Sequence, residues 1–420
     1  MRAPSPPPPP SPSPSPPLGL LLSLCAGILL TCLVFSYLYI SLWRGDHDGL
    51  NHAVGRDFIN LWTASELVDA GRTADIFDQD KFAAAQRQHM GADFPFHFWS
   101  YPPQALFLTE QLSSLPYRVA FLTWTLCGLL VLFYAAQKFW PAMKSFPWLL
   151  LLAPSTFVNV FLGQNGFITT TLAIAGFTML DRRPILSGIM FGLLTFKPHL
   201  GILIPVSLLA MRQWKAIAAA TVTAVLLAGA TTLMYGEAVW WQFLDSTLPH
   251  QLRFMSTSEG PFRWMMPGWF MAGRIIGLPL WLAHTVQTIV AIGAVILVYR
   301  VFRAGPGGQG GLRGLRDWRL RVSLLFVATF AASPQGFNYD MGLISIPLIC
   351  LSVDAMKTGW RRGEFITVAF CWTLPVLMMP LNAHGLPIGP LLLAGLLAYL
   401  YYRIQVTIEP DRQVLQHGVA

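Results

Sequence analysis

Apolar residues gather in long runs along this chain, and polar residues occupy the connections between the runs. An α-helix needs about 20 mostly apolar residues to cross the roughly 30 Å of hydrocarbon in a bilayer, and helices inside a bundle can be shorter. The pattern therefore predicts an all-α polytopic membrane protein with about twelve transmembrane helices. The runs lie near 18–42, 117–137, 147–162, 165–181, 184–197, 199–211, 215–235, 280–302, 321–334, 339–357, 364–381 and 387–404.

The two ends of the chain differ from this repeating pattern. Residues 1–17 are rich in Pro and Ser, which predicts a disordered cytoplasmic tail because this composition cannot form a packed core. The run at 18–42 is too long for the apolar region of a signal peptide and follows prolines instead of a basic stretch. We therefore expect a transmembrane domain over residues 18–407 and a cytoplasmic tail over 408–420.

Charged residues are scarce, and their positions orient the helices. Only 11% of the residues are charged, whereas soluble domains have about twice that fraction. The net charge of +8 arises from short basic connections, which the positive-inside rule places in the cytoplasm with both termini. We expect a multi-pass protein of the cell inner (plasma) membrane, in which the Gly- and Arg-rich residues 303–321 contact anionic lipid and not nucleic acid. The other basic connections contain Arg182, Arg183, Arg212, Lys215, residues 357–362 and Arg403.

The opposite, extracytoplasmic face then receives most of the polar segments. The loop at 43–103 is long and acidic, and it contains an amphipathic run that ends before Gly71 and a second helical pattern over 78–90. This loop should be structured, and the chemistry should lie on its side of the membrane. The other segments on this face are the turns 163–165 and 197–199, the loop 236–279 and the stretch 333–340.

Asp57 is the acid that the first loop offers for chemistry. It follows Gly55 and Arg56 directly and precedes the first helical run of the loop. A carboxylate here can frame a site for a lipid-borne substrate. The alternative is that Asp57 only caps the helix, since Asp before an apolar run is a common helix start.

Lys197 and His199 interrupt an otherwise apolar stretch, and Pro198 between them breaks the helix. Ionisable residues are costly in such stretches and indicate function, and a lysine beside a histidine is suited to a phosphate or pyrophosphate anion. The alternative is a lysine that extends to the membrane surface. Asp340 is a second acid, which could equally cap the following helix.

Other chemistry has little support in the sequence. The chain has no G-x-S-x-G motif, no phosphate-binding P-loop and no Cys/His cluster with zinc spacing. We therefore expect no cofactor and no metal site, although a divalent cation is left open.

An ordered set of short motifs resembles glycosyltransferase family 87, polyprenyl-phosphate-dependent membrane enzymes with the GT-C fold that include mannosyl- and arabinofuranosyltransferases. The resemblance covers about residues 45–350 and implies a GT-C fold with a structured first extracytoplasmic loop. The motifs are Gly55-Arg56-Asp57-Phe58, Tyr101-Pro102-Pro103, Leu115-Pro116-Tyr117 with Ala120 and Trp124, Gly163-Gln164-Asn165, Phe196-Lys197-Pro198-His199, and Ser333-Pro334 to Tyr339-Asp340.

The resemblance implies that Asp57 is the catalytic base of an inverting transfer from a polyprenyl-phosphate sugar to a lipid or glycan acceptor of the cell envelope. Some members have a histidine in the segment that corresponds to 333–340, whereas this chain has Asn338 and Asp340 there, so no histidine role carries over. A transporter or a flippase for lipid-linked sugars is the alternative function, because transporters also build sites from broken helices. The residues expected to bind the donor phosphate or the substrate are Lys197, His199, Arg56, Gln164, Asn165, Tyr101, Asn338 and Asp340.

Overall fold

The computed structural model describes residues 30–417 apart from 31–32, 35, 38, 258–259, 304–310, 313–314 and 316. The described residues form helices and turns without a β-strand, so the predicted all-α class is confirmed. The predicted tail at 1–17 and most of the run at 18–42 lie outside the described residues. At the other end, α18 extends over Gly389–His417, so the last apolar run and most of residues 408–420 form one helix.

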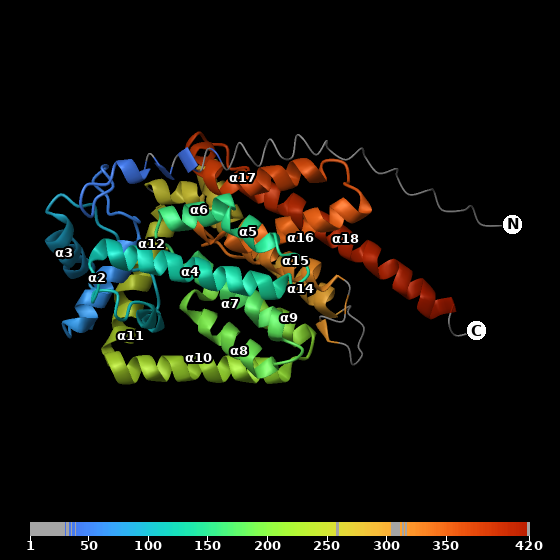
Figure 1. The fold of residues 1–420 in the computed structure, drawn as a ribbon, viewed down its shortest axis with the longest axis horizontal. Helices are drawn as coiled ribbons and strands as arrows, with labels where there is room; N and C mark the ends of the chain where they lie inside the picture. Colours follow the sequence, from blue (N-terminus) through green and yellow to red (C-terminus); the bar gives the residue numbers. More distant parts are fainter. Residues whose placement is uncertain are drawn as a thin grey trace.

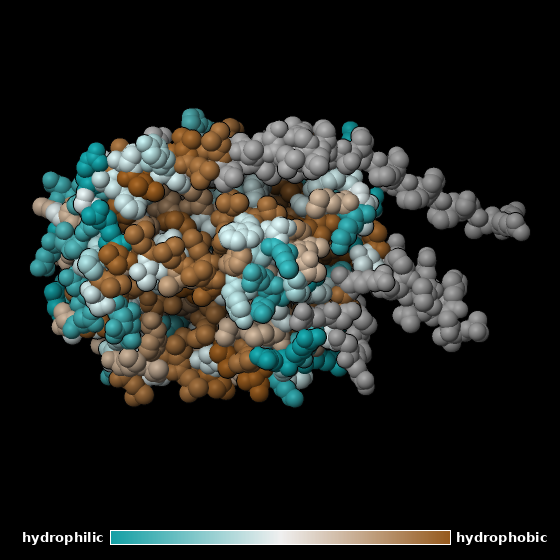
Figure 2. Space-filling model, viewed as in Figure 1, coloured by the Kyte–Doolittle hydropathy of each residue, from teal (hydrophilic) through white to brown (hydrophobic). Residues whose placement is uncertain are grey.

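Among the described residues, four helices are long and apolar enough to cross a membrane: α4 (Tyr117–Phe139), α10 (Trp214–Tyr235), α14 (Leu280–Arg303) and α17 (Glu364–Ala383). Their outer surfaces are apolar, and α10 in particular exposes Val222, Val225, Leu226 and Leu233. Figure 2 shows hydrophobic residues over the middle of the visible face and hydrophilic residues at its left end. Apolar surface of this extent is not stable in water, which indicates a membrane protein.

Between the first and the last apolar runs, the other runs form shorter helices. Five of them are α7 (Gly166–Met179), α8 (Pro184–Leu193), α9 (Ile204–Ala210), α15 (Trp318–Ala332) and α16 (Gly342–Thr358). The run at 147–162 is divided into α5 (Phe146–Leu151) and α6 (Pro154–Phe161). The division occurs at a proline, which has no N–H group for a continuing helix.

The first loop has two helices where its pattern predicts them, α2 (Phe58–Asp69) and α3 (Gln79–Met90). It also forms two 3-10 turns that were not predicted, η1 (Thr73–Ile76) and, at its end, η2 (Pro103–Leu108). Gly71 ends α2 with a φ of +69°, and Asp78 caps α3 by accepting a hydrogen bond from the Lys81 N–H.

The prediction that α2 is amphipathic is wrong, because the helix is buried on most sides. Nine of its twelve residues are buried. Phe58 packs against Tyr117 and Phe121 of α4, and Trp62 Nε1 donates a hydrogen bond to the Leu115 carbonyl at 3.2 Å. α2 is therefore an internal helix that is fixed against the bundle.

The first loop and the segment 238–257 gather at one end of the bundle. In Figure 1, α2, α3, α11 (Ala238–Gln242) and α12 (Leu248–Thr257) lie on the left, while α18 leaves the bundle on the right. Two of the basic connections also contact each other, since Asp181 after α7 accepts a hydrogen bond from the Leu312 N–H at 2.9 Å.

Candidate active site

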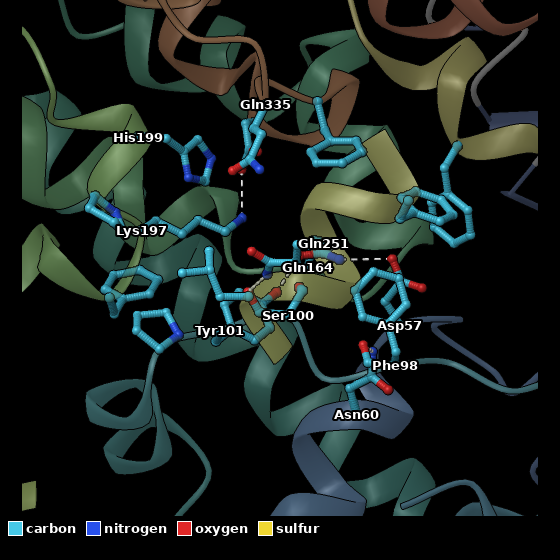
Figure 3. Close-up of a pocket in the computed structure, with 18 of the residues that line it drawn as sticks. Asp57, Asn60, Phe98, Ser100, Tyr101, Gln164, Lys197, His199, Gln251 and Gln335 are labelled. Carbon is cyan, nitrogen blue, oxygen red and sulfur yellow. Dashed lines mark hydrogen bonds and ion pairs between the residues drawn. The ribbon is translucent and has the colours of Figure 1, made fainter. Parts of the chain in front are cut away.

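One cavity of about 400 Å³ is lined by all five segments that the sequence analysis assigned to the extracytoplasmic face. Figure 3 shows Asp57 and Lys197 on opposite sides of this cavity, with Gln164, Tyr101 and Gln251 between them. The segments contribute Asp57 and Tyr101 from the first loop, Gln164 from the α6–α7 turn, Lys197 and His199 from the α8–α9 connection, Gln251 from α12, and Asp340 from the α15–α16 connection.

The Asp57 carboxylate lies in this cavity and does not cap α2. Asp57 occupies the position before the helix, yet its side chain makes no hydrogen bond to the α2 backbone. Instead, Oδ2 accepts a hydrogen bond from Gln164 Nε2 at 2.8 Å, and Oδ1 lies 3.0 Å from His97 Nδ1. The Asp57 side chain is 12% exposed and lines the cavity, so the carboxylate retains access to it.

Two tight turns bring Asp57 and Gln164 together. Gly55 and Gly163 have φ values of +73° and +61°, which glycine adopts without steric cost. A Cβ atom on Gly163 would lie 2.2 Å from the Gly55 carbonyl oxygen, so the two backbones are in direct contact. The Asp57 N–H also donates to the Leu162 carbonyl at 3.1 Å. Only glycine at position 163 permits this approach.

Tyr101 orients the amide of Gln164. The Tyr101 hydroxyl donates a hydrogen bond to Gln164 Oε1 at 2.9 Å, so the amide nitrogen faces Asp57. Burial, with a further contribution from nearby carboxylates, raises the pKa of Tyr101 well above 10. The phenol therefore keeps its proton and acts as the donor. A chain of hydrogen bonds then runs from Tyr101 through Gln164 to the Asp57 carboxylate.

Lys197 and Asp340 form a buried ion pair on the other side of the cavity. Lys197 Nζ lies 2.7 Å from Asp340 Oδ1, and their side chains are 5% and 0% exposed. Nζ also lies 5.0 Å from the ring centre of Tyr339. Lys197 therefore does not extend to a surface. Asp340 belongs to the 3-10 turn η8 (Asn338–Asp340) and does not cap α16, which starts after Met341.

A family model described as Glycosyltransferase family 87 matches residues 99–334, which is more than half of the chain. This chain belongs to glycosyltransferase family 87. The matched residues of this membrane glycosyltransferase include Tyr101, Gln164 and Lys197, whereas Asp57 and Asp340 lie outside the match. No curated protein and no solved structure matches the chain significantly.

Of the other residues that were predicted for the site of this family 87 enzyme, some line the cavity and others do not. His199 lines the cavity beside Lys197. Arg56 lies outside the lining that the structure describes, and it forms an ion pair with the buried Asp48 at 2.8 Å. Asn338 also lies outside this lining and donates a hydrogen bond to the Pro375 carbonyl of α17 at 3.0 Å. Asn165 is fully buried before α7, next to the lining residue Gln164.

Sequence reasoning missed His97, Asn60, Gln251 and Gln335, which all line the cavity. His97 stands in a run of aromatic residues at 94–101 that is equally typical of a membrane interface. As the one histidine in that run, it was a signal that could have been used. Gln251 of α12 donates a hydrogen bond to the Ser100 carbonyl, which ties α12 to the first loop. Among the described residues, no group of three or more His, Cys, Asp and Glu side chains could hold a metal ion.

Proposed function

We propose that this family 87 member is an inverting glycosyltransferase with a polyprenyl-phosphate sugar as its donor. It moves mannose, or another hexose or pentose, to a hydroxyl group of an envelope lipid or glycan. The observation that carries this proposal is the Asp57 carboxylate, which two donors hold at a cavity whose opposite side carries Lys197.

Asp57 is the general base in this mechanism. The acceptor hydroxyl gives its proton to an Asp57 oxygen while its own oxygen attacks the anomeric carbon of the sugar. The bond between this carbon and the phosphate oxygen breaks at the same time, and the electron pair leaves with the phosphate. Because the phosphate departs without a proton, one carboxylate suffices, unlike in glycoside hydrolases, which need an acid and a base. A single displacement inverts the configuration of the anomeric carbon.

Lys197 stabilises the negative charge that develops on the leaving phosphate. Its ion pair with the fully buried Asp340 supports this role, because it fixes the Lys197 side chain at the cavity. A donor phosphate in the cavity would be within reach of the same ammonium group, with His199 beside it as a further lining residue.

The wall formed by α12 and the residues after it suits a lipid-linked substrate. Phe254 and Met255 of α12, together with Phe262 and Met266, line the cavity with apolar surface. Such a wall keeps water from the reacting sugar, which would otherwise be hydrolysed. It also matches the apolar first units of a polyprenyl chain.

The proposal includes the GT-C fold, about twelve membrane crossings and an extracytoplasmic cavity in the cell inner membrane. The basic connections support this orientation through the positive-inside rule. Membership of a glycosyltransferase family favours an enzyme over the transporter or flippase.

Transfer of labelled sugar by an Asp57→Asn variant tests the catalytic proposal. The substrates are tritium-labelled polyprenyl-phosphate mannose and a lipid extract of the host membrane. Loss of a general base typically lowers the rate about 10²–10⁴-fold, so we expect Asp57→Asn to stay folded and lose activity to this extent. Asn caps helices about as well as Asp, so a capping role predicts nearly unchanged activity.

Asp340→Asn is the matched control, since it makes the same change in the other acid of the cavity. An active Asp57→Asn protein beside an inactive Asp340→Asn protein would mean that Asp57 is not the base. If both variants transfer sugar like the wild type, the mechanism is wrong.

A further inference from the structure

His97 contacts the base directly and comes from a different segment of the first loop. It lies between α3 and η2, is 9% exposed and lines the cavity. Its Nδ1 atom is 3.0 Å from Asp57 Oδ1, a hydrogen-bond distance.

The backbone of His97 is fixed by one buried glutamine. Gln86 of α3 is fully buried, accepts a hydrogen bond from the His97 N–H at 3.1 Å and donates one to the His97 carbonyl at 2.7 Å. The same amide group donates to Asn60 Oδ1 of α2 at 2.8 Å. Both helices of the loop therefore hold His97 in place.

The ring of His97 is held in one orientation by its neighbours. It stacks on Phe94 with ring centres 5.6 Å apart and planes at 26°, and the His52 ring lies at 84° to it with ring centres 6.0 Å apart. Because a carboxylate faces Nδ1, the ring satisfies this contact only when Nδ1 carries the proton and donates it. The contact therefore requires the form of the imidazole that has a proton on Nδ1.

We propose that His97 is the positioning residue of the catalytic base. His97 holds Oδ1 and Gln164 holds Oδ2, so the carboxylate cannot rotate and presents its remaining lone pairs to the acceptor hydroxyl. This inference rests on the proposed role of Asp57 as base. His97 acts through Asp57 and does not itself remove the acceptor proton.

Two substitutions of His97 separate the hydrogen bond from the packing of the ring. His97→Phe keeps a ring against Phe94 and removes the donor. His97→Asn places an amide N–H close to the position of Nδ1 and keeps the donor. The matched control is His52→Phe, which makes the same change in the neighbouring histidine, whose ring makes a T-shaped contact with His97. All variants are compared with the wild type by gel-filtration elution and thermal unfolding before assay.

The assay measures kcat and KM with tritium-labelled polyprenyl-phosphate mannose and a lipid extract of the host membrane. Small misplacements of a catalytic group cost about 10²-fold, so His97→Phe should lower kcat to this extent and leave the KM for the donor unchanged. His97→Asn should recover most of kcat, and His52→Phe should match the wild type.

Wild-type kcat in folded His97→Phe overturns the inference. So does a His97→Asn protein that is folded and as inactive as His97→Phe, because that result means that His97 itself removes the proton. If His97→Phe misfolds, the kcat of His97→Asn, compared with that of His52→Phe, decides the inference. An active Asp57→Asn variant would refute the proposed base, whereas an inactive one with fully active His97→Phe would refute this inference alone.

Discussion

At the residue scale, the Lys197–Asp340 pair decides how the role of Lys197 can be tested. Lys197→Ala leaves the fully buried Asp340 without its partner. Removing one member of a buried pair typically costs about 3–5 kcal/mol, so lost activity in this variant could reflect lost stability. Lys197→Met with Asp340→Asn removes both charges together and avoids this problem.

We expect the double variant Lys197→Met, Asp340→Asn to fold and to lose donor use, because no cation then meets the leaving phosphate. Lys197→Arg should retain part of the activity, since the charge remains but the compact ammonium group does not. Thermal unfolding and donor kinetics check both results, with Asp340→Asn alone as the control. Wild-type donor kinetics in the double variant would show that Lys197 is only structural.

Tyr101 offers a milder test at the same scale. Tyr101→Phe keeps the ring beside Lys197 and removes the hydroxyl that orients Gln164. A typical hydrogen bond contributes about 0.5–1.5 kcal/mol, so we expect a decrease in kcat of about 2- to 10-fold with unchanged stability of the bundle. Steady-state kinetics of sugar transfer measure the decrease. A loss as large as that expected for Asp57→Asn would mean that the Tyr101 hydroxyl contacts substrate.

The candidate residues were predictable one by one, but their partners were not. Asp57, Gln164 and Lys197 each stand out against their local sequence as polar residues beside apolar runs. The partners of Asp57 are 40 and 107 residues away, and Lys197 and Asp340 are 143 residues apart. Such distances are closed by helix packing, which a local pattern does not contain. For this reason Arg56 and Asn338 were assigned to the site, although their side chains bind Asp48 and the α17 backbone.

At the element scale, the contact between the turn before α2 and the turn before α7 holds the site together. Gly163→Ala places a methyl group against the Gly55 carbonyl and Phe58, which must push the two turns apart. Gln164 should then lose its hydrogen bond to Asp57. We expect a large loss of sugar transfer and a lower unfolding temperature.

Gly71→Ala is the matched control for this prediction. Gly71 also has a positive φ, at +69°, but a Cβ atom there has nothing within 4 Å. Its substitution should cost only the strain of the left-handed backbone, about 1–2 kcal/mol, and leave transfer unchanged. Equal losses of activity in the two variants would show that backbone strain, and not the contact between turns, is responsible.

Element positions followed from the sequence more closely than element lengths. The apolar runs predicted α4, α10, α14 and α17 to within a few residues. The run at 199–211 contains only the seven-residue helix α9, because a 3-10 turn over Pro198–Leu200 occupies its first residues. Apolar periodicity does not distinguish a crossing helix from a short buried one. The amphipathic prediction for α2 failed for a related reason, since the polar residues Asn60, Thr63 and Ser65 are buried against neighbouring helices.

At the scale of the whole molecule, the orientation of the bundle determines which substrates can reach the cavity. The first loop and α12 lie at one end of the bundle, and both contribute to the cavity. From the positive-inside rule we propose that this end lies outside the cytoplasm, where the proposed donor is a lipid-linked sugar. Labelling of engineered cysteines in intact cells tests this orientation.

In a variant without the five native cysteines, a single cysteine replaces Ala84 of α3, or Arg182 or Lys357 in the basic connections. All three positions are exposed. A membrane-impermeant maleimide should label position 84 in intact cells, because the proposed topology places α3 outside. It should label positions 182 and 357 only after the cells are permeabilised, which also shows that these thiols are reactive. Labelling of 182 and 357 but not 84 in intact cells would place Asp57 in the cytoplasm. The donor would then have to reach Asp57 from the cytoplasmic side. The topology would no longer support a polyprenyl-phosphate donor.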